Sequence, residues 1–578
     1  MLKNGNKDLA TRYSGVSKLD TPFHNFFRIA IYLLVISGLL IFILWPIVAV
    51  LFESVYYNGI LDLSNYKQIF TENRQLLINS LFIALLSTLL AVFLGLCIAL
   101  FITHSNNRGK RVVFSILLLT MISPPFVSSL AYIMLFGKRG IITYKLLGLS
   151  VNPYGWHGIV LMQSIGFTSL AALLIIGVLR GIDRSLEQAS MDLGASSFQT
   201  LMKVTIPLAK PGIIATVLLV FIRSLSDFGT PIIIGGGFSV LATEAYLNVI
   251  GLYNMPKAAA MSTLLLLPAL VIFIVYRFIM GKSQFFSTKT VSLGDREIKL
   301  SRWINIFLAV ITWSFVILMV LKYLTIFYGA FAKTWGVDFS LSLRHVKALN
   351  IRRLNSFVRS LKYSLIAGLL GSAVGILISY ITERKKIIGW QMIDFIATLP
   401  FMIPGTFFGI GYILAFHDYP LAFTGTAFIV VVNCIYRQLP IGTKAGTAVL
   451  SQLNPELEYS AMDLGARELH VLKDIIMPAV KPAFLVSFIN TFTATMTTIG
   501  AIIFLVSPES KVATVEMFDA IKNGDIGLGA VFANLIIISV LIINISFSWL
   551  VLKKKKNSYS SNGGTQYVST IETINQRV

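Results

Sequence analysis

Ionisable side chains inside apolar stretches are the first residues in this sequence whose types could do chemistry. Arg223 and Asp227 stand four positions apart in one such stretch, a spacing that puts both on one face of a helix. Charged groups inside a membrane usually face a bundle interior or a polar cavity. The pair therefore predicts either a self-satisfied ion pair that stabilises the interface between the two halves of the chain or part of a polar pathway for a solute.

Hydroxyl groups and prolines extend this candidate pathway. The stretch TFTATMTT places Thr491, Thr495 and Thr498 at spacings that suit one helix face. A path lined by these groups would be polar but weakly charged, which suits passage without tight binding. Pro124 and Pro404 each interrupt an apolar run, because proline lacks an N–H and disfavours a helical residue before it. Each proline predicts either a gate or a kink fixed by packing.

Groups that would catalyse a reaction or hold a metal ion do not cluster in the sequence. The six histidines and two cysteines are scattered, without an HExxH motif or a Cys/His spacing. Cys97 and Cys434 lie inside apolar runs and imply no disulfide framework. Residues Gly281–Ser283 match the end of a phosphate-binding loop motif, but the motif is incomplete because Tyr276 occupies the position of its first glycine. We expect no catalytic residue, no metal site and no cofactor bound by this chain.

The composition places these residues in a membrane rather than in a soluble globule. The chain has 578 residues, of which 56% are hydrophobic and only 13% charged, whereas soluble domains carry about 25% charged residues. The formal net charge of +22 falls mainly in short loops and tails between apolar runs, as the positive-inside bias predicts. Since no basic domain is present, this distribution argues against a nucleic-acid partner.

Apolar runs of about 20 residues or more are long enough to cross the hydrocarbon core as helices. Twelve such runs cover residues 29–54, 77–103, 112–136, 157–180, 212–234, 258–280, 303–330, 358–382, 389–416, 421–445, 483–506 and 527–552. The chain is therefore expected to be an all-α polytopic membrane protein with helical halves at 29–280 and 303–552. A polar tail at 1–28, a linker at 281–302 and a basic, disordered tail at 553–578 complete it.

Basic residues set the expected orientation. The loop 104–111, the linker, the loop 383–387 and Lys553–Lys556 fall on one side of a twelve-span arrangement, which predicts that both termini are cytoplasmic. The segment 333–362 is also basic but falls on the other side, where long loops translocate regardless of charge. It predicts either an interfacial helix on anionic lipid headgroups or a docking surface for an acidic extracytoplasmic partner.

An internal repeat relates the two halves. When the chain is aligned with itself so that the stretch MDLGA at 191–195 matches the same stretch at 462–466, the later part of each half is matched; we call this the later alignment. A slightly larger shift of the chain matches residues nearer the start of each half, including Gly95 with Gly375; we call this the earlier alignment. An even number of spans per half keeps both copies in one orientation, so the repeat is parallel, about an axis along the membrane normal. The sequence thus predicts two homologous six-helix halves.

The polar segment around MDLGA predicts a helix–glycine–helix unit in each half. The first helix would end at a glycine, Gly194 or Gly465, and the second at a proline, Pro207 or Pro478. An ordinary interfacial helix is one interpretation. The other is a cytoplasmic surface used twice by a two-fold partner, because the polar residues of this segment match between halves better than most lipid-facing positions do.

The segments LEQASMDLGASSFQTLMKVTIPLAKP and LEYSAMDLGARELHVLKDIIMPAVKP resemble the EAA loop of bacterial ABC-importer permeases. The resemblance implies a type I ABC-importer permease fold whose coupling loops, at 186–212 and 457–483, dock on two copies of a separate cytosolic ATPase that binds ATP and Mg. The coupling residues it implies are Glu187, Ala189, Asp192, Gly194 and Pro207 in the first copy, and Glu458, Ser460, Asp463, Gly465 and Pro478 in the second. The acidic residue precedes the usual EAA position by one, so a fixed salt bridge at that position is not implied.

Two further stretches bear on the cargo. SDFGTPIIIGGGFSVLATEAY and ATLPFMIPGTFFGIGYILAF resemble permeases of the ferric-iron importer type. This resemblance implies ferric iron as cargo, delivered by an extracytoplasmic binding protein to a multi-pass protein of the bacterial inner membrane. The same group contains importers of sugar phosphates, 2-aminoethylphosphonate, thiamine and polyamines, which stay open as alternatives. A secondary transporter driven by an ion gradient is a further alternative.

Overall fold

A computed structural model of the chain describes residues 22–57, 59–105, 109–149, 152–282, 300–418, 420–466 and 468–559. Most of the expected N-terminal tail (1–28), linker (281–302) and C-terminal tail (553–578) lies outside these residues. At both ends, a helix extends into a segment expected to be tail, since the first described helix begins at Pro22 and the last ends at Tyr559.

The first half is helical apart from one short hairpin. Its elements, in which η marks π- and 3₁₀-helical stretches, are α2 (Pro22–Leu39), η2 (Leu40–Leu44), α3 (Trp45–Glu53), β1 (Tyr56–Tyr57), β2 (Ile60–Leu61), α4 (Ser64–Thr71), α5 (Arg74–His104), α6 (Lys110–Ile122), α7 (Pro125–Phe136), η3 (Ile141–Leu146), α8 (Trp156–Arg180), α9 (Arg184–Asp192), α10 (Ser197–Thr200), η4 (Leu201–Thr205), α11 (Ile206–Leu225), α12 (Gly229–Ile234), α13 (Leu241–Ile250) and α14 (Met255–Lys282). Strands β1 and β2 pair antiparallel, with Tyr56 opposite Leu61.

The second half repeats this order. Its elements are α15 (Arg302–Gly329), β3 (Ala332–Thr334), β4 (Asp338–Leu341), α16 (Arg344–Lys347), α17 (Ile351–Tyr380), η6 (Ile381–Lys385), α18 (Trp390–Thr398), η7 (Leu399–Phe401), α19 (Gly405–Phe416), α20 (Ala427–Leu450), α21 (Glu456–Asp463), α22 (Glu468–Val471), η8 (Leu472–Ile476), α23 (Met477–Thr497), η9 (Ile502–Phe504), α24 (Ala513–Lys522) and α25 (Ile526–Tyr559). The basic segment 333–362 thus forms an antiparallel hairpin, α16 and the start of α17, and the Lys333 ammonium pairs with Asp338 of the hairpin at 3.1 Å.

The membrane-spanning helices differ from the expected twelve. Within the described part of the chain, ten helices are long and apolar enough to cross a membrane, or eleven if one bent pair counts as a span. The run 112–136 is divided into α6 and α7, and the candidate span there is Phe126–Leu146. The run at 421–445 corresponds to α20, which is more polar because it contains Arg437, Gln438 and Lys444.

The expected repeat is present in the helices themselves. In the later alignment, the first residue of α8, Trp156, falls on the first residue of α20, Ala427, and the first residues of α11 and α23 coincide in the same way. A buried hydrogen bond recurs as well. The hydroxyl of Ser80 accepts from the N–H of the first residue of α13 at 2.8 Å, and that of Ser360 accepts from the first residue of α24 at 2.7 Å.

Small residues bring the central helices of each half together. A Cβ added to Gly95 on α5 would lie 2.7 Å from the Ala171 Cβ on α8, and one on Gly375 of α17 would lie 3.0 Å from the Gly442 Cα on α20. Such close backbone approach is typical of helix packing in membranes, where dispersion forces rather than the hydrophobic effect join helices.

The first helices of the two halves are exchanged. In the first half α3 packs on α19 of the second, where the hydroxyl of Tyr412 donates to the carbonyl of Phe42 at 2.8 Å. Conversely, α15 packs on α5, α6 and α7, where the Lys322 ammonium donates to the Ser128 hydroxyl at 2.9 Å. The halves are therefore interlocked.

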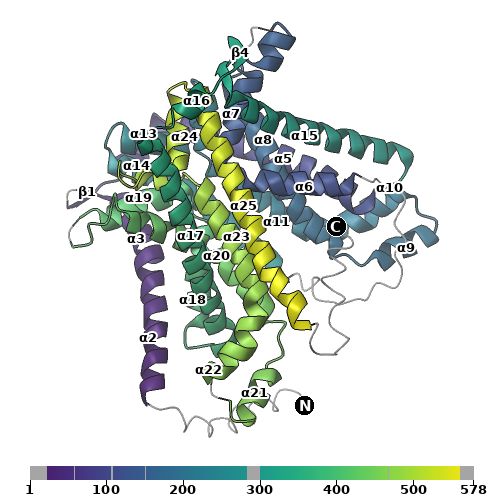
Figure 1. Ribbon diagram of the computed structural model, residues 1–578, viewed down its shortest axis with the longest axis vertical. Helices are drawn as coiled ribbons and strands as arrows, with labels where there is room; N and C mark the ends of the chain where they lie inside the picture. Colours follow the sequence, from purple (N-terminus) through teal and green to yellow (C-terminus); the bar gives the residue numbers. More distant parts are fainter. Residues whose placement is uncertain are drawn as a thin grey trace.

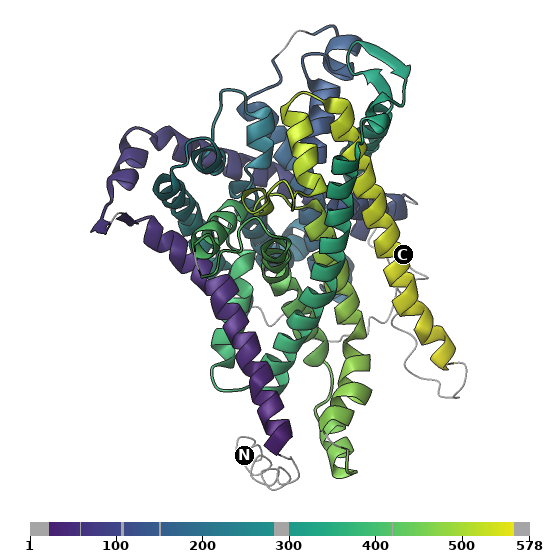
Figure 2. The same cartoon turned by 60° about the vertical axis from the view of Figure 1, so that its left-hand side comes forward.

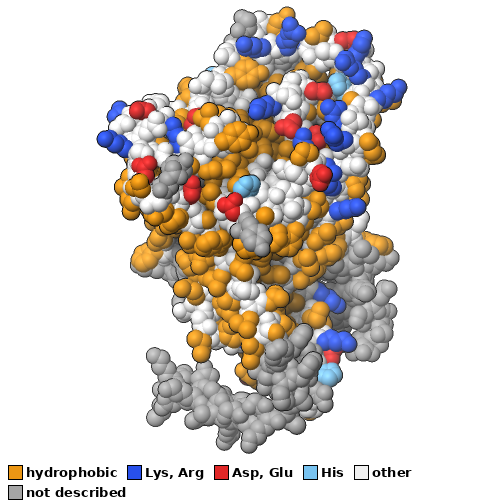
Figure 3. Space-filling model, turned by 90° about the vertical axis from the view of Figure 1, so that its left-hand side faces the viewer, with side chains coloured by type: hydrophobic (Ala, Val, Ile, Leu, Met, Phe, Trp, Pro, Cys, Tyr) orange, Lys and Arg blue, Asp and Glu red, His pale blue; other side chains and the backbone are white. Residues whose placement is uncertain are grey.

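The bundles diverge from a shared region. Figure 1 shows α9 at the end of a bundle that runs to the right and α21 at the end of one that runs downward. Figure 2 shows the N-terminal helix, in purple, and the C-terminal helix, in yellow, descending on opposite sides of the molecule. On the face drawn in Figure 3, charged side chains gather in the upper part, above a belt of hydrophobic side chains, as expected for a surface in contact with lipid.

Candidate functional site

The first repeated helix begins in the same way in both halves. The Asp183 carboxylate accepts a hydrogen bond from the N–H of Ser185 at 2.9 Å at the start of α9. The Asn454 side-chain oxygen accepts from the N–H of Glu456 at 3.1 Å at the start of α21. Asp183 is the N-cap of α9, where its oxygen satisfies an N–H group that lacks a partner in the helix. Asn454 lies one residue before the N-cap of α21, Pro455, so the repeat preserves the hydrogen bond while changing the charge of its acceptor.

The helix also ends in the same way, at the expected glycines. Gly194 and Gly465 have φ angles of +91° and +88°, a left-handed conformation that glycine adopts at little cost. The N–H of Ala195 donates to the Ser190 carbonyl and that of Ala466 to the Ala461 carbonyl. This is the Schellman arrangement, in which the chain reverses immediately after a helix.

Two leucines lie at the tips of these turns. Leu193 and Leu464 are each 90% exposed, although each is a large apolar side chain. The residues predicted to couple the loop to a partner, Ala189, Asp192, Ser460 and Asp463, are exposed beside them. Next to α9, the side chains of Leu186, Leu193 and Leu208 contribute to an open, mainly apolar hollow. The arrangement presents two equivalent apolar knobs.

The acidic residues of the repeated loops face inward instead. The Glu187 side chain is 3% exposed; its carboxylate contacts His104 Nε2 at 3.1 Å and accepts a short hydrogen bond from the Thr205 hydroxyl. Burial alone would raise the pKa of Glu187, but the hydrogen bonds from His104 and Thr205 outweigh it and hold that pKa below its ordinary value. Glu187 thereby fastens α9 to the end of α5.

The second half uses an arginine for the same task. The Nε of Arg384 lies 3.0 Å from the Glu458 carboxylate, and its Nη2 donates to the carbonyls of Leu450 and Leu453 at 2.8 and 2.6 Å. The earlier alignment, which matches Gly95 with Gly375, also matches His104 with Arg384. The sequence alone did not lead us to His104 or Arg384 as partners of the acidic residues, although the match between them in that alignment could have done so.

The expectation that Pro207 and Pro478 end a helix is wrong. From Ser197 to Leu225 the chain is one continuous helical segment, in which Pro207 follows a π-helical stretch, and Pro478 occupies the same place after η8. The wider π turn offers room for a proline ring, which otherwise clashes with the preceding turn. The polar loop and the next span are thus mechanically joined.

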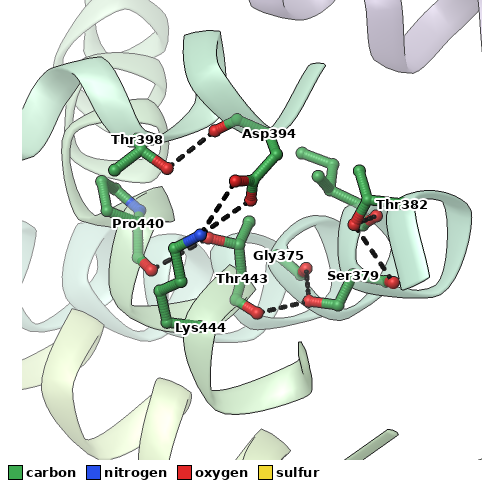
Figure 4. Close-up of polar contacts among 9 residues, drawn as sticks. Gly375, Ser379, Thr382, Asp394, Thr398, Pro440, Thr443 and Lys444 are labelled. Carbon is green, nitrogen blue, oxygen red and sulfur yellow. Dashed lines mark hydrogen bonds and ion pairs between the residues drawn. The ribbon is translucent and has the colours of Figure 1, made fainter. Parts of the chain in front are cut away.

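Figure 4 shows how the second bundle is held together near this loop. The Lys444 ammonium on α20 lies 2.8 and 3.0 Å from the two carboxylate oxygens of Asp394 on α18. The Ser379 hydroxyl on α17 donates to the Thr443 carbonyl on α20 at 2.6 Å. These contacts connect three helices, so movement of α20 is expected to carry α17 and α18 with it.

The ion pair between Arg223 and Asp227, one of the two interpretations of their spacing, is not formed. Helix α11 ends at Leu225, so Asp227 lies beyond it and accepts from the N–H groups of Gly229 and Thr230 at 3.0 and 3.2 Å. Gln163 donates to the same carboxylate at 3.0 Å. The Arg223 side chain is exposed, and its guanidinium lies 5.8 Å from the ring centre of Phe401 in the other half. The two residues predicted to share one helix face therefore have separate surroundings.

The predicted threonines also differ in environment. Thr491 and Thr495 are buried on α23, 1% and 7% exposed. Thr498 lies just past the end of α23 in an extended conformation, and its carbonyl accepts from the Thr514 hydroxyl at 3.0 Å. The expected single hydroxyl-bearing face thus ends at Thr495.

Pro124 and Pro404 interrupt their runs as expected. Each lies immediately before a helix, α7 or α19, with nearly equal backbone angles: φ and ψ of −56° and 143° for Pro124, and −53° and 144° for Pro404. At Pro404 the chain bends by 113° between Trp390–Phe401 and Gly405–Phe416. The ring of Phe401, just before this bend, faces the Arg223 guanidinium of the first half.

The chain is similar to known membrane components of transport systems. The model of the family described as "Binding-protein-dependent transport system inner membrane component" matches it twice, at residues 91–282 and 371–552. Each match contains one of the repeated loops with its exposed leucine. The family comparison therefore coincides with the repeat that the helices display.

Individual relatives extend this similarity over nearly the whole chain. The ferric transport system permease protein FbpB of Actinobacillus pleuropneumoniae is 32% identical over 543 residues, 91% of this chain and 78% of the relative. The putative ferric transport system permease protein FbpB 1 of Haemophilus influenzae is 32% identical over 513 residues, 86% of this chain and 81% of the relative. A probable molybdenum ABC transporter permease protein of Haloferax volcanii is 30% identical over 202 residues, 35% of this chain and 72% of the relative.

Proposed function

The chain belongs to the family of binding-protein-dependent transport system inner membrane components, and we propose that it forms the whole transmembrane pathway of an ATP-driven importer. In this proposal, two copies of a separate cytosolic ATPase dock on the loops 186–212 and 457–483, and an extracytoplasmic binding protein delivers the cargo. Both termini are cytoplasmic. The chain itself hydrolyses no ATP.

The observation that carries the docking proposal is the pair of leucines, each 90% exposed at the tip of an equivalent turn. Exposed large apolar side chains with polar neighbours are typical of protein interaction sites. A partner pocket that receives Leu193 would receive Leu464 in the same way, which suits a two-fold ATPase. Because each knob continues through a helical segment into a span, closure of the ATPases would move both halves.

Ferric iron is the cargo we propose, supported by the names of the two relatives that match over most of the chain, both ferric transport system permeases. Sugar phosphates, 2-aminoethylphosphonate, thiamine and polyamines are the alternatives within the same machinery. A transporter driven by an ion gradient would need no cytosolic knobs and is the remaining alternative.

Uptake by whole cells tests this proposal. A strain that lacks the gene should lose uptake of radiolabelled ferric iron, and the wild-type chain should restore it. The double variant Leu193→Glu, Leu464→Glu should not restore it, because a carboxylate in an apolar partner pocket is costly to desolvate. Leu252→Glu is a matched control, since Leu252 is 67% exposed in the loop between α13 and α14.

Two results would contradict the proposal in different ways. If the deletion strain took up ferric iron normally but lost uptake of another solute from the set above, the proposed cargo would be contradicted and the proposed ATP-driven mechanism would stand. Full uptake by the Leu193→Glu, Leu464→Glu variant would contradict the proposed coupling to the ATPases. So would uptake that an uncoupler abolishes while cellular ATP is maintained.

A further inference from the structure

Two arginines from different halves meet where the halves face each other. Arg223 lies near the end of α11, and Arg437 lies on α20; both helices run through the centre of the molecule in Figure 1. The Arg223 guanidinium faces Phe401, and the Arg437 Nη atoms lie 2.6 and 2.7 Å from the point where a Cβ of Gly405 would be. Since Phe401 and Gly405 flank one bend, both cations lie at the same junction.

Among the residues that the structure describes, neither cation has a counter-ion. No ion pair or hydrogen bond there joins Arg223 or Arg437 to a carboxylate, and the Nη1 of Arg437 is buried without a hydrogen-bond partner. A buried guanidinium nitrogen without a partner is unfavourable, so a ligand that supplies hydrogen-bond acceptors and negative charge would stabilise this arrangement.

The local backbone adds to the positive potential. Helix α19 begins at Gly405, beside Arg437, and the first N–H groups of a helix have no partner within it. With glycine at this position, the Arg437 guanidinium can lie directly against the start of the helix. The buried Thr406 hydroxyl in this first turn also has no hydrogen-bond partner. Several donors therefore gather at this junction.

We propose that Arg223 and Arg437 form an oxyanion-binding site on the path between the halves. Guanidinium groups match the geometry of phosphate and carboxylate oxygens and keep their charge in apolar surroundings. The site would repel a bare trivalent cation, so a ferric cargo would pass it only with oxyanion ligands that offset its charge. This inference rests on the proposed transport function, and it specifies the charge of the species that is carried.

Binding to the full-length chain in lipid nanodiscs tests the site. The probes are radiolabelled phosphate, radiolabelled citrate, and citrate loaded with labelled ferric iron. Arg223→Gln and Arg437→Gln should each weaken binding of the probe that the wild type binds, and the double variant should weaken it at least about tenfold, a change that corresponds to about 1.4 kcal/mol. Arg223→Lys and Arg437→Lys should retain part of the binding.

Arg180 provides the matched control, because it is also exposed and lies 5.7 Å from the ring centre of a phenylalanine, Phe114. Arg180→Gln should bind like the wild type. Binding of phosphate or citrate alone would identify the free oxyanion as the ligand, whereas binding of ferric citrate alone would identify the iron complex. A double variant that elutes as a folded protein and binds as the wild type does, or a wild type that binds none of the three probes, would overturn the inference.

Uptake assays separate this inference from the transport proposal. Loss of ferric uptake in the deletion strain, together with full uptake by the Arg223→Gln, Arg437→Gln variant, would contradict the oxyanion site and retain the transport function. Oxyanion binding that the two arginines control, in a chain whose deletion leaves ferric uptake unchanged, would retain the site and contradict the proposed cargo.

Discussion

Glu187 and Glu458 hold the acidic position of the repeated loop, and both use it to attach the loop to their own half. The partner base is a histidine in the first half and an arginine in the second. Because a guanidinium group offers five donors in a planar fork and an imidazole ring offers only two nitrogens, the two attachments are chemically unequal. In the docking proposal, the residues that face the partner are instead the exposed ones, Leu193 and Leu464 foremost.

The attachment of α9 should weaken in acid. A carboxyl group whose pKa is lower in the folded than in the unfolded state stabilises the fold fully above its unfolded value, and this stabilisation is lost as the pH falls through the folded value. For Glu187 the ordinary value is 4.5 and the folded pKa lies below it. Amide exchange in α9, corrected for its intrinsic pH dependence, should therefore rise as the pH falls below 4.5.

Glu187→Gln is the control for that experiment. It should raise exchange in α9 already at neutral pH, by the equivalent of about 1–3 kcal/mol for a buried polar group that loses its partner, and it should remove the additional rise in acid. Equal acid sensitivity in the variant and the wild type would assign the change to other groups.

At the scale of elements, each exposed leucine is followed by a continuous helical segment that leads into a span, and the coupling proposal depends on this continuity. The sequence predicted the helix–glycine turn correctly, because a residue with positive φ after a helix leaves a clear glycine signal. It failed at Pro207 and Pro478, because the π-helical stretch that admits each proline arises from packing and has no motif of its own. It also placed Asp227 on the helix of Arg223, since spacing alone could not show that α11 ends at Leu225.

Close contact between α5 and α8 should make Gly95 intolerant of any side chain. A Cβ there would meet the Ala171 Cβ at 2.7 Å and the Ala172 nitrogen at 2.8 Å, and both neighbours are on or next to the backbone. Gly95→Ala should destabilise the protein by about 1–3 kcal/mol, the usual cost of overpacking. Thermal unfolding in detergent measures the effect.

Gly177 on α8 serves as the comparison, because a Cβ added there would meet nothing within 4 Å. Gly177→Ala should leave stability unchanged or raise it by up to about 1 kcal/mol through helix propensity. Equal effects of the two substitutions would mean that the α5–α8 contact does not limit the packing.

At the scale of the whole molecule, two homologous halves are interlocked by exchange of their first helices. The sequence repeat predicted the halves, since the matching residues of the earlier and later alignments are visible without a structure. The packing of α3 on α19 and of α15 on α5 to α7 was not predicted, because an apolar helix does not specify in its sequence which apolar neighbour it joins. The meeting of Arg223 and Arg437 likewise depends on tertiary packing, as neither alignment matches one with the other.

The central claim is that one chain carries two equivalent docking elements, and the mass of its complex with the cognate ATPase tests it most directly. Native mass spectrometry of the purified complex should show two ATPase copies per chain. Leu193→Glu alone and Leu464→Glu alone should each weaken one contact and favour a single copy, and the double variant should bind none. One ATPase copy on the wild-type chain, or two copies retained on the double variant, would contradict the account.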